Sequence, residues 1–535
     1  MKFTKTLAVV SATGLALGLA ACSGSDDTAT DSSAGESSSG NAIVTAWGSE
    51  PQNPLNPQNT NETGGGRIID SVFAGLVYYD ADGKVHNEMA ESIEPSEGNK
   101  VFTIKIKDGM KFADGTAVDS DSFIDAWNYA VENALLSNYF FEPIEGYNDG
   151  GEKLTGLEKV DDLTFKVTLT QPEADFPLRL GYSAFYPLPK VAFEDMDAFG
   201  EKPVGNGMYK VSDWQHNKSL KVVPNENYTG VRKVANDGVE FVFYSKPDAA
   251  YTALQSGNLD IIDTIPDSAL STFRDELGDR AINQPSAIFQ SFTIPEKIEH
   301  FNGEEGNLRR QALSMAINRP LICEKIFQDT RTPATDFTSP VIAGHSDSLT
   351  GAEVLEYNPD KAKELWAKAD AISPWSGEFT IAYNADGGHQ GWVDAAANDI
   401  KNTLDIDAHG KAYPDFKSLR DEVTNRTITG AFRTGWQADY PALANFLGPL
   451  YGTGAGSNDG DYSNEAFDAK LEQGAGASDL DSSIKTYNEA QEILLEDLPA
   501  IPLWYSNVTG GYGESVSNVK FGWNSVPLYY MVEKK

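Results

Sequence analysis

Two opposite charges six residues apart are the most distinctive chemical feature of this sequence. Arg433 and Asp439 enclose a short segment that includes Gly435, Trp436 and Gln437. On a strand, the odd-numbered residues from 433 to 439 share one face, which would be about 20 Å long. That face would carry a cation at one end and an anion at the other, with accessible backbone between them. The pattern is complementary to an extended zwitterion such as a short peptide. A salt-bridged surface strand is the alternative.

The elements around this segment predict a mixed α/β protein. Residues 427–432 are rich in β-branched and aromatic side chains, and Pro441 cannot donate to a ladder, so we expect a strand that ends near Pro441. Further strands are predicted at 101–107 and 238–243, and amphipathic helices at 309–318 and 482–497. Because strands and helices alternate without an internal repeat, we expect mixed β-sheets flanked by helices.

Composition excludes one class of partner. The chain has 535 residues, enough for two or three domains, and 40% of them are hydrophobic. Its formal net charge is −37. Nucleic-acid binding requires clustered Lys and Arg to neutralise phosphates, so this strongly acidic chain is not expected to bind nucleic acid.

The first 40 residues have the composition of an export and attachment segment. Residues 1–22 join a basic start to a short apolar stretch, which is typical of a signal peptide, and they end in Leu19-Ala20-Ala21-Cys22. This ending resembles a bacterial lipobox, in which the Cys22 thiol is lipidated; a chance cysteine at an ordinary cleavage site is the alternative. Residues 23–40 lack large apolar side chains and predict a disordered tether. We therefore expect a monomer held by lipid at the extracytoplasmic face of the bacterial cell membrane.

Eight short motifs in order give the chain a family resemblance. They are the lipobox, 48–50 with 55–57, 73–76, 102–116, 205–209, 255–260, 308–319 and 435–440. Together they resemble the extracytoplasmic solute-binding proteins of family 5, the substrate-binding lipoproteins of oligopeptide and dipeptide ABC importers. The resemblance implies capture of an extended oligopeptide, without a cofactor, and its delivery to a membrane permease with ATPase subunits. Dipeptides, signalling peptides, haem, metal chelates and oligosaccharides are the alternative ligands.

The resemblance also implies an architecture. It is the large, cluster-C type of the two-lobed periplasmic-binding-protein fold, with three domains. One lobe would combine a discontinuous domain, residues 41–59, 185–290 and 508–535, with an inserted domain, residues 60–184. The other lobe would span residues 291–507. Two crossings between the lobes, near residues 290 and 508, would form a hinge about which the lobes close on a ligand.

Roles for individual residues follow from the same resemblance. Asp439 is expected to accept the α-ammonium group of a peptide, a charge-assisted contact. Arg433 would pair with the terminal carboxylate of shorter peptides, and His389 with that of longer ones. The other expected ligand contacts are Asn61, Thr63, Tyr139, Gly435, Trp436 and Gln437. The simpler alternatives are a structural carboxylate for Asp439, a surface position for His389 and core packing for Trp436.

The chain departs from the family pattern in two places. The best-known members carry a paired cysteine where this chain has Gln437, and the loop 61–66 is unusual. The second of these departures bears on the contacts that the first lobe would make.

An enzyme is the main alternative class of protein. Ser482 and Lys485 match the Ser-x-x-Lys motif of penicillin-recognising acyltransferases, but no Lys-Thr-Gly follows them, and the chain has no Gly-x-Ser-x-Gly. The six His and two Cys are scattered and predict no metal-ligand cluster. The sequence therefore predicts a binding protein without catalytic residues or metal.

Overall fold

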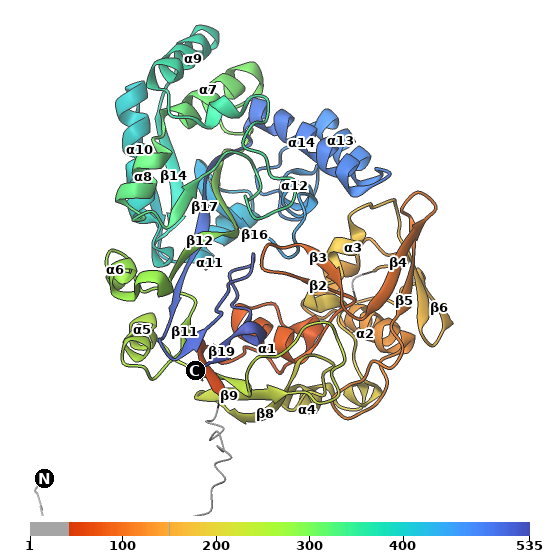
Figure 1. Cartoon of the computed structure of the whole chain (residues 1–535). Coiled ribbons are helices and arrows are strands. Elements are labelled where there is room, and N and C mark those ends of the chain that lie inside the picture. Colours follow the sequence, from red (N-terminus) through yellow and green to blue (C-terminus); the bar gives the residue numbers. More distant parts are fainter. Residues whose placement is uncertain (1–41, 149) are drawn as a thin grey trace, which may run out of the picture. The chain divides into compact units, whose positions relative to one another are not determined.

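A computed structural model describes residues 42–148 and 150–535 (Figure 1). The predicted signal peptide with Cys22 and the predicted tether lie outside these residues. No helix of the described part is long and apolar enough to cross a membrane.

One long mixed sheet carries most of the strands. Its order is β15-β14-β16-β12-β17-β11-β1-β10-β9-β8, and β13 pairs with β17. The bounds are β1 Ile43–Gly48, β8 Tyr209–Gln215, β9 Ser219–Pro224, β10 Gly238–Phe243, β11 Ile261–Ile262, β12 Ala281–Thr293, β13 Arg331–Pro333, β14 Glu378–Asn384, β15 Asp407–Tyr413, β16 Ala431–Gln437 and β17 Ala500–Tyr512. Parallel pairs, such as β1 with β10, and antiparallel pairs, such as β12 with β17, occur in the same sheet.

The two longest of these strands, β12 and β17, pair with each other and connect the two parts of the sheet. β12 and β17 pair from Ala281 opposite Gly511 to Thr293 opposite Ala500, with a register shift between Pro285 and Phe289. On one side of this pair β17 pairs with β11, and on the other side β12 pairs with β16. The predicted crossings near residues 290 and 508 fall within these two strands.

The remaining strands of the described residues form three smaller sheets. The largest has the antiparallel order β4-β5-β7-β6, and the two others pair β2 with β3 and β18 with β19. Their bounds are β2 Val77–Tyr79, β3 Val85–Asn87, β4 Ala90–Ser96, β5 Val101–Ile106, β6 Leu157–Asp161, β7 Thr164–Thr168, β18 Val516–Ser517 and β19 Glu533–Lys534.

Helices surround the sheets (Figure 1). They are α1 Thr63–Val72, α2 Ser120–Glu132, α3 Phe176–Arg179, α4 Met196–Glu201, α5 Pro247–Gln255, α6 Phe273–Leu277, α7 Gly303–Ala316, α8 Arg319–Lys325, α9 Pro359–Ile372, α10 Gln390–Leu404, α11 Phe416–Thr424, α12 Ala444–Tyr451, α13 Glu465–Ala475 and α14 Leu480–Asp497. The predicted helices 309–318 and 482–497 correspond to α7 and α14. α14 begins slightly earlier than predicted because the Asp479 side chain caps it by accepting from the Ser482 backbone N–H.

The buried hydrophobic side chains form two large clusters. The first core consists mainly of residues between Val44 and Ile261, and the second core of residues between Ala287 and Trp523. β16 belongs to the part of the sheet that packs on the second core, whereas α1 packs into the first core through Ile68, Ile69 and Val72.

Candidate peptide-binding site

β16 presents an open edge along its C-terminal half. On one side, Phe432–Gln437 pair with Thr293–Ile288 of β12. On the other side, β14 pairs only with Ala431 and Phe432. Within the described residues, no strand pairs with this second side from Thr434 to Gln437, which we call the open edge. Backbone N–H and C=O groups along the open edge are therefore placed to pair with an extended ligand.

Asp439 follows the open edge and is held in place by Asn445. Asn445 is buried in the first turn of α12, and its Oδ1 accepts from the Asp439 backbone N–H at 2.9 Å and from Trp436 Nε1 at 3.3 Å. Its Nδ2 donates to Asp439 Oδ2 at 3.2 Å. The strand ends at Gln437 rather than near Pro441, because the Asn445 side chain, and not a neighbouring strand, takes up the Asp439 N–H. Asp439 therefore lies beyond the strand face on which it was predicted.

Burial sets the charge behaviour of this carboxyl group. It raises the pKa of Asp439 from 3.8 to about 6, and the hydrogen bond from Asn445 opposes that rise. At neutral pH the group is ionised but poorly hydrated. A cation that can replace the lost hydration is therefore the ligand group that best complements it.

A cavity of about 360 Å³ lies beside Asp439. Gln437 and Asp439 line one side of it, and Asn61 and Thr63 line it from the first core, so folding brings these four predicted residues together. Tyr139 is not part of the lining, but partial burial and the charge of Asp439 raise its pKa, which places it within electrostatic reach of that carboxylate.

The segment that contains Asn61 and Thr63 is helical in part. α1 begins at Thr63, four residues before Arg67, and Glu62 Oε1 caps it by accepting from Gly65 N–H at 2.8 Å. A Cβ at Gly64 would lie 2.2 Å from Ser49 Oγ, so a larger residue there would force the Ser49 side chain to move. Thr63 therefore reaches the cavity from a helix N-terminus and not from an extended segment.

Arg433 lies near the opposite end of β16, whereas His389 lies between β14 and α10. Arg433 Nε donates to Asn384 Oδ1 at 3.0 Å, and its guanidinium stacks on Phe416 at 5.1 Å from the ring centre. His389 precedes α10, and its Nδ1 accepts from Trp392 Nε1 at 3.1 Å, which leaves the ring proton on Nε2.

The two predicted charges line different cavities. Arg433, Gly435 and Trp436 line a second cavity of about 260 Å³, whereas Asp439 lines the first. The open edge connects these two cavities. His389 is not part of the lining of either one.

Several residues of the site carry no recognisable sequence signal. Asn445 is one, and Asp70 and Tyr182 are two others that line the first cavity. Asp70 accepts a hydrogen bond from the Tyr186 hydroxyl at 3.0 Å, across 116 positions of sequence. Only an analysis of covariation or the folded structure could connect such positions.

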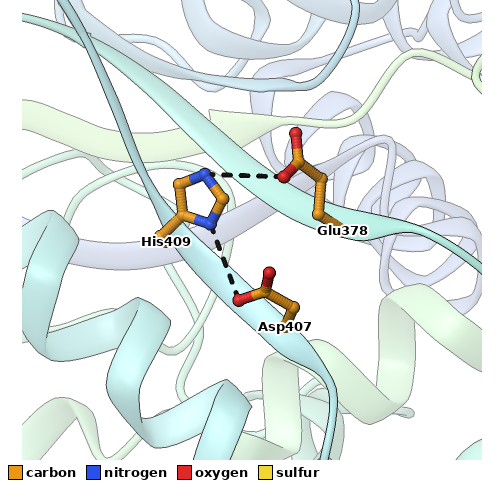
Figure 2. A group of neighbouring side chains, drawn as sticks. All are labelled: Glu378, Asp407 and His409. Atoms are coloured by element: carbon orange, nitrogen blue, oxygen red, sulfur yellow. Dashed lines mark ion pairs between the residues drawn. The ribbon is translucent and has the colours of Figure 1, made fainter.

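A separate group of ionisable side chains lies at the outer edge of the long sheet (Figure 2). Glu378 of β14 and Asp407 and His409 of β15 bring together ligand atoms that could hold a metal ion, which the scattered His and Cys did not predict. However, His409 Nε2 lies 3.8 Å from Glu378, whereas Nδ1 lies 3.8 Å from Asp407. Since the two carboxylates flank opposite ring nitrogens and all three residues are exposed, the group is best described as screened surface ion pairs.

Comparison with known proteins identifies the fold and the family. The model of the bacterial extracellular solute-binding proteins, family 5 Middle, matches residues 84–458. The chain is 25% identical over 472 residues to the dipeptide-binding protein DppE of Bacillus subtilis (strain 168), covering 84% of each protein. It is 27% identical over 473 residues to the periplasmic murein peptide-binding protein MppA of Escherichia coli (strain K12), covering 82% of this chain and 83% of that one.

A solved structure agrees with these matches. The unliganded open form of MppA aligns with a TM-score of 0.80 at 23% identity, over 92% of this chain and 97% of that chain. This likeness confirms the predicted mixed α/β, two-lobed periplasmic-binding-protein fold. The relatives are solute-binding proteins and not enzymes, which confirms that prediction as well. Because the family model spans more than half of its length, the chain belongs to the bacterial extracellular solute-binding proteins of family 5.

Proposed function

We propose that the protein captures extended oligopeptides by their free amino terminus and delivers them to a membrane ABC permease with its ATPase subunits. The observation that carries this proposal is the Asp439 carboxylate, fixed by Asn445 at the end of an open strand edge and beside a cavity. Two relatives, one a dipeptide-binding and one a murein peptide-binding protein, support a peptide ligand.

Asp439 is suited to an ammonium group. The structure gives its carboxylate one side-chain donor, the neutral amide of Asn445, among the described residues. An α-ammonium has three donors and a full positive charge, so it offsets the cost of keeping this carboxylate ionised and out of water. Tyr139 and Tyr182 lie close enough for the charge of Asp439 to raise their pKa, and their rings would shield the pair from solvent.

The open edge would bind the peptide backbone. A peptide that runs from Asp439 toward Arg433 would pair with Thr434–Gln437 as an added strand. Backbone pairing does not depend on the identity of the ligand's side chains, so a broad set of peptides would be accepted. Arg433 would pair with the terminal carboxylate of a short peptide, and His389 with that of a longer one.

Closure would enclose the ligand. We infer three domains with the boundaries predicted from the sequence, and a hinge where β12 and β17 join the two cores. Asn61 and Thr63 line the same cavity as Asp439, so both cores would contact one bound peptide. A lipid on Cys22 would hold the monomeric protein at the extracytoplasmic face of the membrane, close to its permease.

Chemical removal of the ligand's charge tests the proposal. Trialanine and N-acetyl-trialanine are titrated into cargo-stripped protein by calorimetry, with wild type and Asp439→Ala. Leaving one partner of a buried ion pair unpaired costs roughly 3–5 kcal/mol, so acetylation should weaken wild-type binding by about a hundredfold or more. The same acetylation should change the affinity of Asp439→Ala far less. Equal binding of both peptides to wild type would contradict the role of Asp439.

A further inference from the structure

Asp70 brings a second carboxylate to the cavity beside Asp439. It lies in the last turns of α1, and its Oδ1 accepts from the Tyr186 hydroxyl at 3.0 Å. Asp70 and Asp439 both line the 360 Å³ cavity, one from the first core and one from the segment after β16. Asp70 is not among the ligand contacts predicted from the sequence.

The cations that line this cavity already have partners. Arg67 forms an ion pair with Asp263 at 2.7 Å and donates to the Trp47 carbonyl at 2.7 Å. Arg232 lies 3.4 Å from the buried carboxylate of Glu88, and its guanidinium stacks on a tyrosine ring, Tyr78.

The other lining acids are also engaged within the fold. Glu62 caps α1, and Asp80 pairs with His86 at 2.8 Å. Asp70 and Asp439 differ from these acids. Among the described residues, the side chain of Asp70 accepts a hydrogen bond from Tyr186 and that of Asp439 from Asn445, and both donors are neutral. The charge of Arg232 reaches Asp70 but forms no ion pair with it among those residues.

The charges of both carboxylates act on Tyr182. Burial raises the pKa of Tyr182, and the charges of both Asp439 and Asp70 raise it further. Burial also raises the pKa of Asp70 to about 6, as it does for Asp439. Each carboxylate is thus held in a poorly hydrated place where a cation is favoured.

We propose that Asp70 is a second cation receptor, which makes the site select peptides whose first residue is lysine or arginine. This inference rests on the proposed function, since Asp439 must first hold the α-ammonium. The side chain of that first residue then runs past Tyr182 toward Asp70. Its aliphatic stem lies against the tyrosine rings of the cavity, while its charged end reaches the carboxylate.

Two peptides that differ in one charge test this selection. Lys-Ala-Ala and norleucine-Ala-Ala have first side chains of similar length, and only lysine is charged. By calorimetry on cargo-stripped wild type we expect Lys-Ala-Ala to bind about tenfold more tightly or better, as for a partly desolvated ion pair. Asp70→Asn should abolish this preference, so that Lys-Ala-Ala and norleucine-Ala-Ala bind the variant with similar affinity. Asp80→Asn, which removes an acid already paired with His86, is the matched control and should keep the preference.

The outcomes separate this inference from the proposed function. If Asp70 only balances the charge of Arg232, Asp70→Asn lowers the melting temperature while the preference for lysine persists, which overturns the inference. If Asp70→Asn does not fold, Asp70→Ser serves as a second variant. Equal affinity of wild type for the two peptides would also overturn the inference, and this result needs no variant. If N-acetylation leaves wild-type binding unchanged, or if neither peptide binds, the proposed function fails and the inference fails with it.

Discussion

Asn445 contacts Asp439 through both ends of its amide group, accepting from the backbone N–H at 2.9 Å and donating to the carboxylate at 3.2 Å. The same amide oxygen accepts from the Trp436 indole. One buried side chain therefore fixes the end of the open edge and the carboxylate beyond it as one rigid group. Asn445 is a positioning residue for Asp439.

Substitution of Asn445 should weaken binding without removing the charge. Asn445→Ala leaves two donors without their acceptor, so we expect a loss of about 1–3 kcal/mol in stability and a smaller loss of affinity for trialanine than in Asp439→Ala. Asn445→Asp keeps the shape but puts a negative charge beside Asp439, which would raise the pKa of Asp439 further. Calorimetry should then show that Asn445→Asp loses more affinity at pH 6 than at pH 8. An equal loss at both pH values would point to a purely structural role.

Peptide binding should depend on pH through Asp439. Its pKa is about 6 in the unliganded protein, and an ammonium favours the ionised form, so binding is strongest near pH 7, between this pKa and that of the peptide's own amino group, about 8. As pH falls below 6 the proton competes with the ligand, and affinity for trialanine should fall by up to about tenfold per pH unit. Titrations between pH 5 and 8 measure this slope. Asp439→Asn is the control, and it should show a much flatter profile.

His389 and Arg433 should respond to different peptide lengths. His389 carries its ring proton on Nε2 because Trp392 donates to Nδ1, so Nε2 is placed as a donor to a carboxylate. His389→Ala should weaken a pentapeptide by about tenfold and leave trialanine nearly unchanged. Arg433→Ala should have the reverse preference. Identical effects on both lengths would show that these side chains do not read the carboxyl terminus.

Ligand binding should make the molecule more compact. If Asn61 and Thr63 of the first core and Asp439 contact one peptide, the two cores must approach each other when it binds. Small-angle scattering on cargo-stripped protein should show a smaller radius of gyration at saturating trialanine. Asp439→Ala at the same peptide concentration is the control and should stay expanded. An unchanged radius in saturated wild type would argue against a hinge.

Attachment to the membrane should depend on Cys22. Cys22→Ser removes the thiol that a lipid would modify and keeps the rest of the export segment. We expect the variant in the soluble extracytoplasmic fraction, whereas wild type should sediment with membranes and gain the mass of a lipid. Membrane retention of the variant would mean that another feature anchors the protein.

Local patterns were enough to predict many elements but not their ends. The alternation in 101–107 predicted β5, and the amphipathic pattern in 482–497 predicted α14. Each of these patterns is local, because it repeats between residues that are only a few positions apart in the sequence. β16 ends before Pro441 because of the Asn445 side chain, a contact that propensity does not describe. The glycines at 64–66 disfavour a helix, yet α1 begins at Thr63, where the Glu62 side chain caps it.

The site was predictable only in part for a similar reason. Arg433 and Asp439 are candidates because of their charges and spacing, and Asn61 and Thr63 because of the family resemblance. Asp70 is an ordinary acidic residue in the sequence, and its significance appears only when Tyr186 and Asp439 are placed around the same cavity. Charge balance in a cavity is a property of the folded chain, so no local pattern reports it.

The open edge also exposes the protein to self-association. A row of backbone groups without a neighbouring strand can template pairing with any extended segment, including one from a second copy of this chain. The stretch from Thr434 to Gln437 is short, and the turn held by Asn445 stops it from lengthening. A net charge of −37 adds mutual repulsion between copies of the chain. The acidity of the chain thereby helps to keep this edge available for the proposed peptide ligand.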